Sequence, residues 1–163
     1  MPHSLTLEHA FGNGLTATGE EDSIRITGGF TCSVSTEDNQ PSVAGVGGAS
    51  LSPVETGADG TNTVTLTNFT TNITTNEITL DYTLEADGTR NTTELGLTMT
   101  CETATPFSGV EPDNPVQGEM VIADEGGGRI TVTVVDGTWI DVALDADGDG
   151  TREYTTGMSW EDL

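Results

Sequence analysis

The chain has 163 residues, a length typical of one domain with a hydrophobic core of its own. It carries 27 acidic residues against four arginines and no lysine, which gives a formal net charge of -23. Binding to phosphates requires a basic surface, so this charge excludes nucleic acids and anionic membrane surfaces as partners.

The charge also bears on where the protein works. Acidic, lysine-free chains are typical of salt-loving organisms, because about molar salt shortens the screening length to about 3 Å and hides self-repulsion. Many secreted bacterial proteins are acidic as well, so a halophilic origin is one of two alternatives. No apolar run reaches the ~18 residues of a membrane span, and residues 1–15 lack the pattern of a signal peptide. We expect an extracellular, cell-surface or periplasmic protein whose export signal was removed, or a virion component that needs none.

The N-terminal part combines one weak and one clear pattern. Residues 1–21 are weakly patterned and are expected to be ragged. His3 and His9 are interpreted as surface histidines, since a transition-metal site would need further histidine or cysteine ligands. From Ser23 to Ser35 apolar residues occupy every second position, which predicts a half-buried strand with a bulge at Gly28-Gly29.

The middle of the chain is rich in threonine, which favours strands. Residues 37–61 contain many glycines and prolines and are expected to form a long surface loop. Val64 and Leu66 mark a strand. Residues 78–84 and 95–101 alternate on either side of Asp87-Gly88, which predicts a hairpin with its turn at that pair.

The C-terminal part predicts a meander of four strands. Asp136-Gly137 between two apolar runs is a strong hairpin signal, because such a turn favours residues that accept positive φ. Residues 139–144 and 154–160 alternate as another strand pair. Helical periodicity is missing throughout, so we predict an all-β fold, an antiparallel β-sandwich of about eight to nine strands, with an up-and-down β-barrel as the alternative.

Two cysteines occur in the chain, Cys32 and Cys101, and both fall in the inward phase of their predicted strands. In an exported protein a pair of this kind is expected to form a disulfide, which would close a loop of about 70 residues and add roughly 4 kcal/mol of stability. Two buried free thiols are the alternative.

Residues 145–153 follow the predicted strand 139–144 and place carboxylates at every second position, with glycines between and after them. The segment resembles the Asp-x-Asp-x-Asp-Gly calcium loops of EF-hands, dockerins and secreted β-domains. The resemblance implies side-chain ligands from Asp145, Asp147 and Asp149, a backbone carbonyl ligand from Thr151, and a direct or water-mediated ligand from Glu153.

The resemblance is local and departs from the EF-hand pattern. Thr156 stands where the loop would have its bidentate glutamate, and strands rather than helices flank the segment, so an EF-hand fold is excluded and a weak, open calcium site is expected. The alternative is a solvated acidic turn. Against it, closely spaced carboxylates repel one another, and a divalent cation would remove that repulsion.

Three functions remain open. With only two histidines and 5% aromatic residues the chain has no evident catalytic constellation, so we predict that it is not an enzyme. We expect a non-catalytic extracytoplasmic β-domain with a structural calcium loop and a cell-surface, adhesion or binding role, whose protein or glycan partner is unknown. A structural subunit of a virion or surface filament, hence a homo-oligomer, is the alternative. A small secreted hydrolase is the third.

Overall fold

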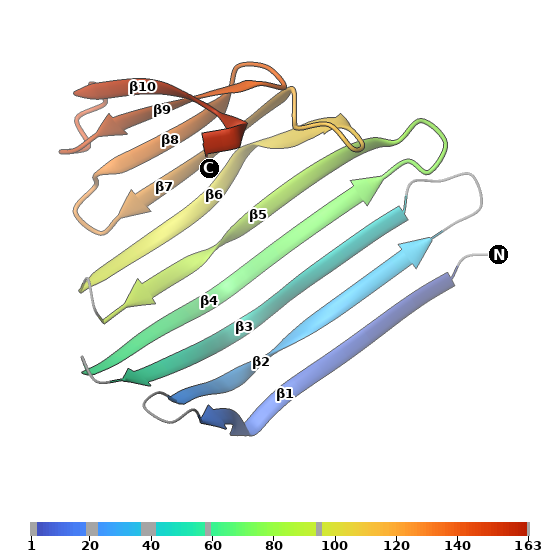
Figure 1. The fold of residues 1–163 in the computed structure, drawn as a ribbon, viewed down its shortest axis with the longest axis vertical. Coiled ribbons are helices and arrows are strands. Elements are labelled where there is room, and N and C mark those ends of the chain that lie inside the picture. The colour runs from blue at the N-terminus through green and yellow to red at the C-terminus, as the bar shows by residue number, and fades with distance from the viewer. Residues whose placement is uncertain (1–2, 19–22, 37–41, 58–59, 94–95, 163) are drawn as a thin grey trace.

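The computed structural model describes residues 3–18, 23–36, 42–57, 60–93 and 96–162, and strands make up 78% of the structure (Figure 1). In chain order the elements are β1 (His3–Thr18), β2 (Ser23–Thr36), β3 (Ser42–Gly57), β4 (Gly60–Thr75), β5 (Asp81–Thr92), β6 (Leu97–Val110), β7 (Gln117–Asp124), β8 (Arg129–Val134), β9 (Trp139–Asp145), β10 (Tyr154–Ser159) and the short 3₁₀ helix η1 (Trp160–Asp162). In the described part of the chain no helix is long and apolar enough to cross a membrane.

The strands form one antiparallel meander. Each strand pairs with its neighbours in sequence, so the sheet runs in the order β1 to β10, and it is not closed into a barrel. Figure 1 shows an extended, twisted layer with the shorter strands β7 to β10 gathered at one end. The prediction of an all-β antiparallel fold is confirmed. All ten described strands belong to this one sheet, so none of them forms the second layer of the expected sandwich.

Two segments that were predicted to be irregular are strands, which raises the strand number to ten. β1 covers most of the predicted ragged N-terminus, and β3 covers most of the predicted loop 37–61, so both predictions are wrong. Residues 1–2, 19–21, 37–41 and 58–59 of these predictions lie outside the described residues. The loop prediction failed because the glycines of β3 do not form turns. They leave room for a side chain from a neighbouring strand. A Cβ added to Gly48 would lie 3.0 Å from Cζ of Phe69 on β4.

The two Asp-Gly pairs differ in what they do. Asp87-Gly88 lies within β5, at a register shift between β5 and β6, so the predicted turn is wrong and the pair forms a bulge. The predicted turn at Asp136-Gly137 is confirmed between β8 and β9, but neither residue has positive φ. Instead the Asp136 carboxylate accepts hydrogen bonds from the backbone N–H groups of Thr138 at 2.8 Å and Trp139 at 3.0 Å.

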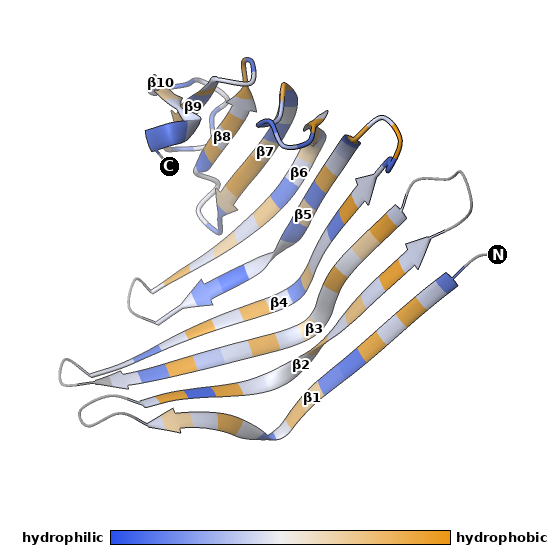
Figure 2. Cartoon of the chain, turned by 45° about the vertical axis from the view of Figure 1, so that its right-hand side comes forward, coloured by the Kyte–Doolittle hydropathy of each residue, from blue (hydrophilic) through white to orange (hydrophobic). Residues whose placement is uncertain are grey.

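A row of bulges crosses the long strands. Register shifts occur in β1/β2 near Phe11, in β2/β3 near Gly29, in β4/β5 near Asn68 and in β5/β6 near Gly88. The bulge predicted at Gly28-Gly29 is therefore confirmed. Each bulge bends its strand and adds twist, and the long strands bend near their middles in Figure 2.

The sheet has two chemically different faces, because residues paired across antiparallel strands point to the same side. Leu7, Cys32 and Val46 are paired across β1 to β3 and lie on what we call the apolar face. The neighbouring row, Thr31 with Glu8 and Gly47, belongs to the opposite, threonine-rich face. The alternating colours along the strands in Figure 2 follow this pattern.

The apolar face is buried only in the C-terminal half of the sheet. Phe107, Val134 and Ile140 form its centre, and Ile140 is 1% exposed. Partly buried side chains pack around them, namely Leu84, Met120, Val132, Val142, Met158 and Trp160. None of the described side chains of β1 to β4 is buried. The hydrophobic core is therefore a property of β5 to β10 and η1.

The predicted disulfide is wrong. Cys32 on β2 and Cys101 on β6 are both free and half-buried. Both lie on the apolar face, as their phase predicted, but β3, β4 and β5 separate them. Four strand steps of about 4.8 Å place them roughly 19 Å apart, whereas the Cα atoms of a disulfide lie within about 7 Å.

The first testable prediction concerns the core. Ile140→Ala should lower the free energy of unfolding by about 2–5 kcal/mol, because it removes packed atoms and leaves a cavity beside Phe107. Ile78→Ala is the matched control, because Ile78 is 78% exposed in the turn before β5, and it should change stability by less than about 0.5 kcal/mol. Denaturant unfolding at fixed high salt measures both. Equal losses would show that Ile140 does not lie at the centre of the core.

The second prediction concerns the cysteines. The protein purified without reductant and unfolded in denaturant should react with two equivalents of a thiol reagent, because its cysteines lie on strands too far apart to pair. Cys32→Ser and Cys101→Ser should each leave one reactive thiol. A wild-type chain without reactive thiols and lighter by two hydrogens would contradict the order of the strands in the sheet.

Candidate metal site

The acidic loop 145–153 connects β9 to β10. The predicted pairing of these two strands is confirmed, with Leu144 opposite Tyr154 and Ile140 opposite Met158. The Glu153 N–H donates to the Leu144 carbonyl at 2.9 Å, which closes the base of the loop on the last residue pair of the hairpin. The loop is therefore fixed at both ends to strands that contribute to the core.

The three aspartates fold the loop through their own carboxylates. Asp145 accepts hydrogen bonds from the N–H groups of Gly148 at 2.8 Å and Gly150 at 3.0 Å. Asp147 accepts from the Asp149 N–H at 3.2 Å, and Asp149 accepts from the Thr151 N–H at 2.6 Å. These contacts reach two to five residues forward and resemble the local turns that aspartate side chains stabilise.

Gly148 is required by its backbone and by its neighbour. Its φ is +73°, a conformation that costs little only for glycine. A Cβ at this position would also collide with the backbone of Gly127, in the turn between β7 and β8. That turn therefore packs against the loop from the side. The packing could not be predicted from the sequence, where Gly126-Gly127-Gly128 indicates only a flexible connection.

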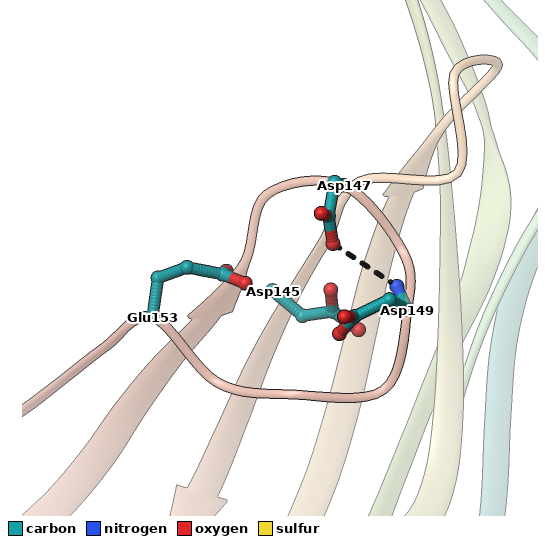
Figure 3. Close-up of side chains that lie close together, drawn as sticks. All are labelled: Asp145, Asp147, Asp149 and Glu153. Atoms are coloured by element: carbon teal, nitrogen blue, oxygen red, sulfur yellow. Dashed lines mark hydrogen bonds between the residues drawn. The ribbon is translucent and has the colours of Figure 1, made fainter.

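Four carboxylates converge inside the loop. Asp145, Asp147, Asp149 and Glu153 each offer one oxygen, and these four oxygens lie within 4.8 Å of one another. Figure 3 shows the four side chains directed toward the space that the loop encloses. Calcium binds oxygens at 2.3–2.6 Å, so ligands on opposite sides of one ion are about 5 Å apart. The four oxygens can therefore hold one metal ion.

Glu153 and Thr151 have different places in this group. Glu153 belongs to the cluster, and its Oε2 also accepts a hydrogen bond from the Ala146 N–H at 2.6 Å, across the loop. Thr151 is exposed, and its N–H donates a hydrogen bond to the Asp149 carboxylate. The ligand role of the Thr151 carbonyl remains a prediction.

Hydrogen bonds within the loop favour the ionised form of Asp149. The hydrogen bond from the Thr151 N–H, followed by one from the Thr151 side chain, holds the pKa of Asp149 below its ordinary value. Asp145 is half-buried and the other three acids are exposed, so water has access to the site. The arrangement therefore offers a charged, hydrated oxygen cage, whose chemistry suits a hard divalent cation and not a soft transition metal.

The two histidines lie on the first strand, far along the sheet from this loop. His3 and His9 are exposed, and the His9 ring packs against Phe11 with ring centres 4.4 Å apart.

Comparison of this chain with protein-family models, with curated proteins and with solved structures finds no match.

Proposed function

We propose that this chain is a non-catalytic, extracytoplasmic β-domain with a binding or adhesion role at a cell surface, whose C-terminal hairpin is stabilised by one structural calcium ion. The proposal of a calcium ion rests on the group of four carboxylate oxygens that lie within 4.8 Å of one another. In the absence of a cation these charges repel one another, whereas a bound cation would neutralise them and join Asp145 at the end of β9 to Glu153 at the start of β10.

The openness of the loop supports calcium of weak to moderate affinity. Three of the four acids are exposed, so water would complete the coordination shell. Sites with few protein ligands bind calcium in the micromolar to millimolar range, and the upper part of this range matches the concentrations at which extracellular modules work. The free cysteines give no support for an extracytoplasmic location, which therefore rests on the calcium and on the acidic composition.

A structural subunit of a virion or surface filament is the second candidate function. One observation favours it, namely that large apolar side chains of the N-terminal strands are exposed, Leu5 by 70% and Leu7 by 60%. Exposed apolar side chains of this kind are stabilised when another protein surface covers them and removes them from water. In a binding domain the covering surface would belong to another molecule, whereas in a subunit it would belong to a copy of the same chain.

The third prediction tests the calcium. Calcium at a hundredfold excess over Kd should raise the free energy of unfolding by about 2.7 kcal/mol, because it binds the folded loop only. For a chain of this length the gain corresponds to a rise in Tm of roughly 5–10 °C. Thermal unfolding at constant high ionic strength, with calcium and then with chelator, measures the rise. Magnesium should have a smaller effect, because it requires a stricter octahedral shell.

A matched pair of variants separates the loop from general screening. Asp147→Asn keeps an oxygen that can accept the Asp149 N–H but removes one charge of the cluster, so it should reduce the calcium effect by more than half. Asp162→Asn makes the same change on an exposed residue of η1, at the opposite end of β10, and should leave the calcium effect intact. An equal response of wild type and Asp147→Asn, or a wild-type Tm indifferent to calcium, would leave the loop as a solvated turn.

A further inference from the structure

The N-terminal half of the apolar face is uncovered. Six of its large side chains are 41–70% exposed and define what we call the N-terminal apolar face: Leu5, Leu7, Leu15, Ile24, Val34 and Ile73. They come from β1, β2 and β4 and lie on the same side of the sheet by register. In the C-terminal half the same face is packed around Phe107. An exposed apolar surface that spans several strands marks an interaction site.

The total surface of the chain indicates how much is left to cover. A compact monomer of 16.9 kDa exposes about 7,700 Å² by the usual scaling. This chain exposes 10477 Å², roughly 2,800 Å² more than that scaling gives. Obligate homodimers bury about 1,000–2,500 Å² on each subunit. The excess of the whole chain is therefore large enough to include the surface that a chain buries in an obligate dimer.

The distribution of charge allows two copies to meet on this face. Although the chain has a net charge of -23, β1 to β4 contain only three charged residues, Glu8, Arg25 and Glu55. By register Glu8 and Arg25 lie on the threonine-rich face, whereas Glu55 is paired with Ile24 and lies on the apolar face, near the end of β3. Each copy therefore presents one described carboxylate, Glu55, on this face, so direct contact between like charges is limited to that residue.

We propose that the N-terminal apolar face packs against the same face of a second copy of this chain, so that two molecules together form the two-layer β-sandwich that one molecule lacks. A twofold axis makes the contact self-complementary, as in most homodimers. Two such sheets pack about 10 Å apart with their side chains interdigitated. Pairing of β1 edges alone would leave the exposed leucines in water, so the face and not the edge is the contact.

The dimer has a defined response to salt. Each copy carries a charge of -23, so long-range repulsion opposes association at low ionic strength. In about 1 M NaCl the screening length falls to about 3 Å, and only the apolar contact remains effective. Association should therefore strengthen as the salt concentration rises.

The experiment compares substitutions on adjacent residues of β1. Leu7 points into the proposed contact, and Thr6 points to the other face, while both are exposed. In about 1 M NaCl wild type and Thr6→Lys should sediment at twice 16.9 kDa. Leu7→Lys should weaken dimerisation by at least about tenfold. Circular dichroism and the unfolding midpoint of the monomeric fraction establish that Leu7→Lys remains folded.

A second measurement follows the reactivity of a cysteine inside the proposed contact. Cys32 is paired with Leu7 and lies within the proposed contact. In a Cys101→Ser background, alkylation of Cys32 should slow as protein concentration rises through the dimerisation range, and Leu7→Lys should remove this dependence. A monomeric wild type in high salt, or equal effects of Leu7→Lys and Thr6→Lys, would overturn the proposal. In the first case another protein would be the occupant of the face.

Discussion

Coverage of one apolar sheet face is the requirement on which the rest of this structure depends. Hydrogen bonds between neighbouring strands satisfy the backbone everywhere in the sheet, but they do not remove side chains from water. Around Phe107 and Ile140 the shorter strands and η1 gather and supply that coverage within the chain. Along β1 to β4 nothing described in the chain does so, and the side chains stay exposed. The same face thus serves as a core at one end and as a surface at the other.

The acidic loop belongs to the covered end. It joins β9 and β10, and these strands place Ile140 and Met158 opposite each other in the core. Whatever orders the loop also favours the pairing that buries these residues. A cation held between Asp145 and Glu153 would act on the hydrophobic packing through the hairpin base, where the Glu153 N–H meets the Leu144 carbonyl. The order of the acidic loop and the stability of the core therefore depend on the same hairpin.

Local patterns predicted the C-terminal strand pair and the acidic loop well, because strand alternation and the hydrogen bonds of aspartate side chains act over a few residues. The strand pair 139–144 and 154–160, the phase of both cysteines and the convergence of Asp145, Asp147, Asp149 and Glu153 needed no knowledge of distant parts of the chain.

Predictions that depended on partners beyond the local segment failed. Glycines in β3 looked like a loop because the Phe69 ring that fills the space above Gly48 comes from the next strand. Asp87-Gly88 looked like a turn for the same reason, since a Cβ at Gly88 would lie 2.9 Å from Cβ of Phe69. Phase placed both cysteines on one face but contains no information on how many strands separate them.

The order of the sheet gives the N-terminal strands β1 to β4 a one-dimensional energetics. Every strand hydrogen-bonds only with its neighbours in sequence, and β1 to β4 add no residue to the buried cluster around Phe107, so the stability of β1 to β4 approximates a sum of strand and nearest-neighbour contributions, as in repeat proteins. Opening can begin at β1 and proceed strand by strand without disturbing Ile140, so loss of the N-terminal strands can precede the cooperative unfolding of the core. Hairpins could be added to or lost from the β1 side during evolution while the acidic loop and the core remain unchanged.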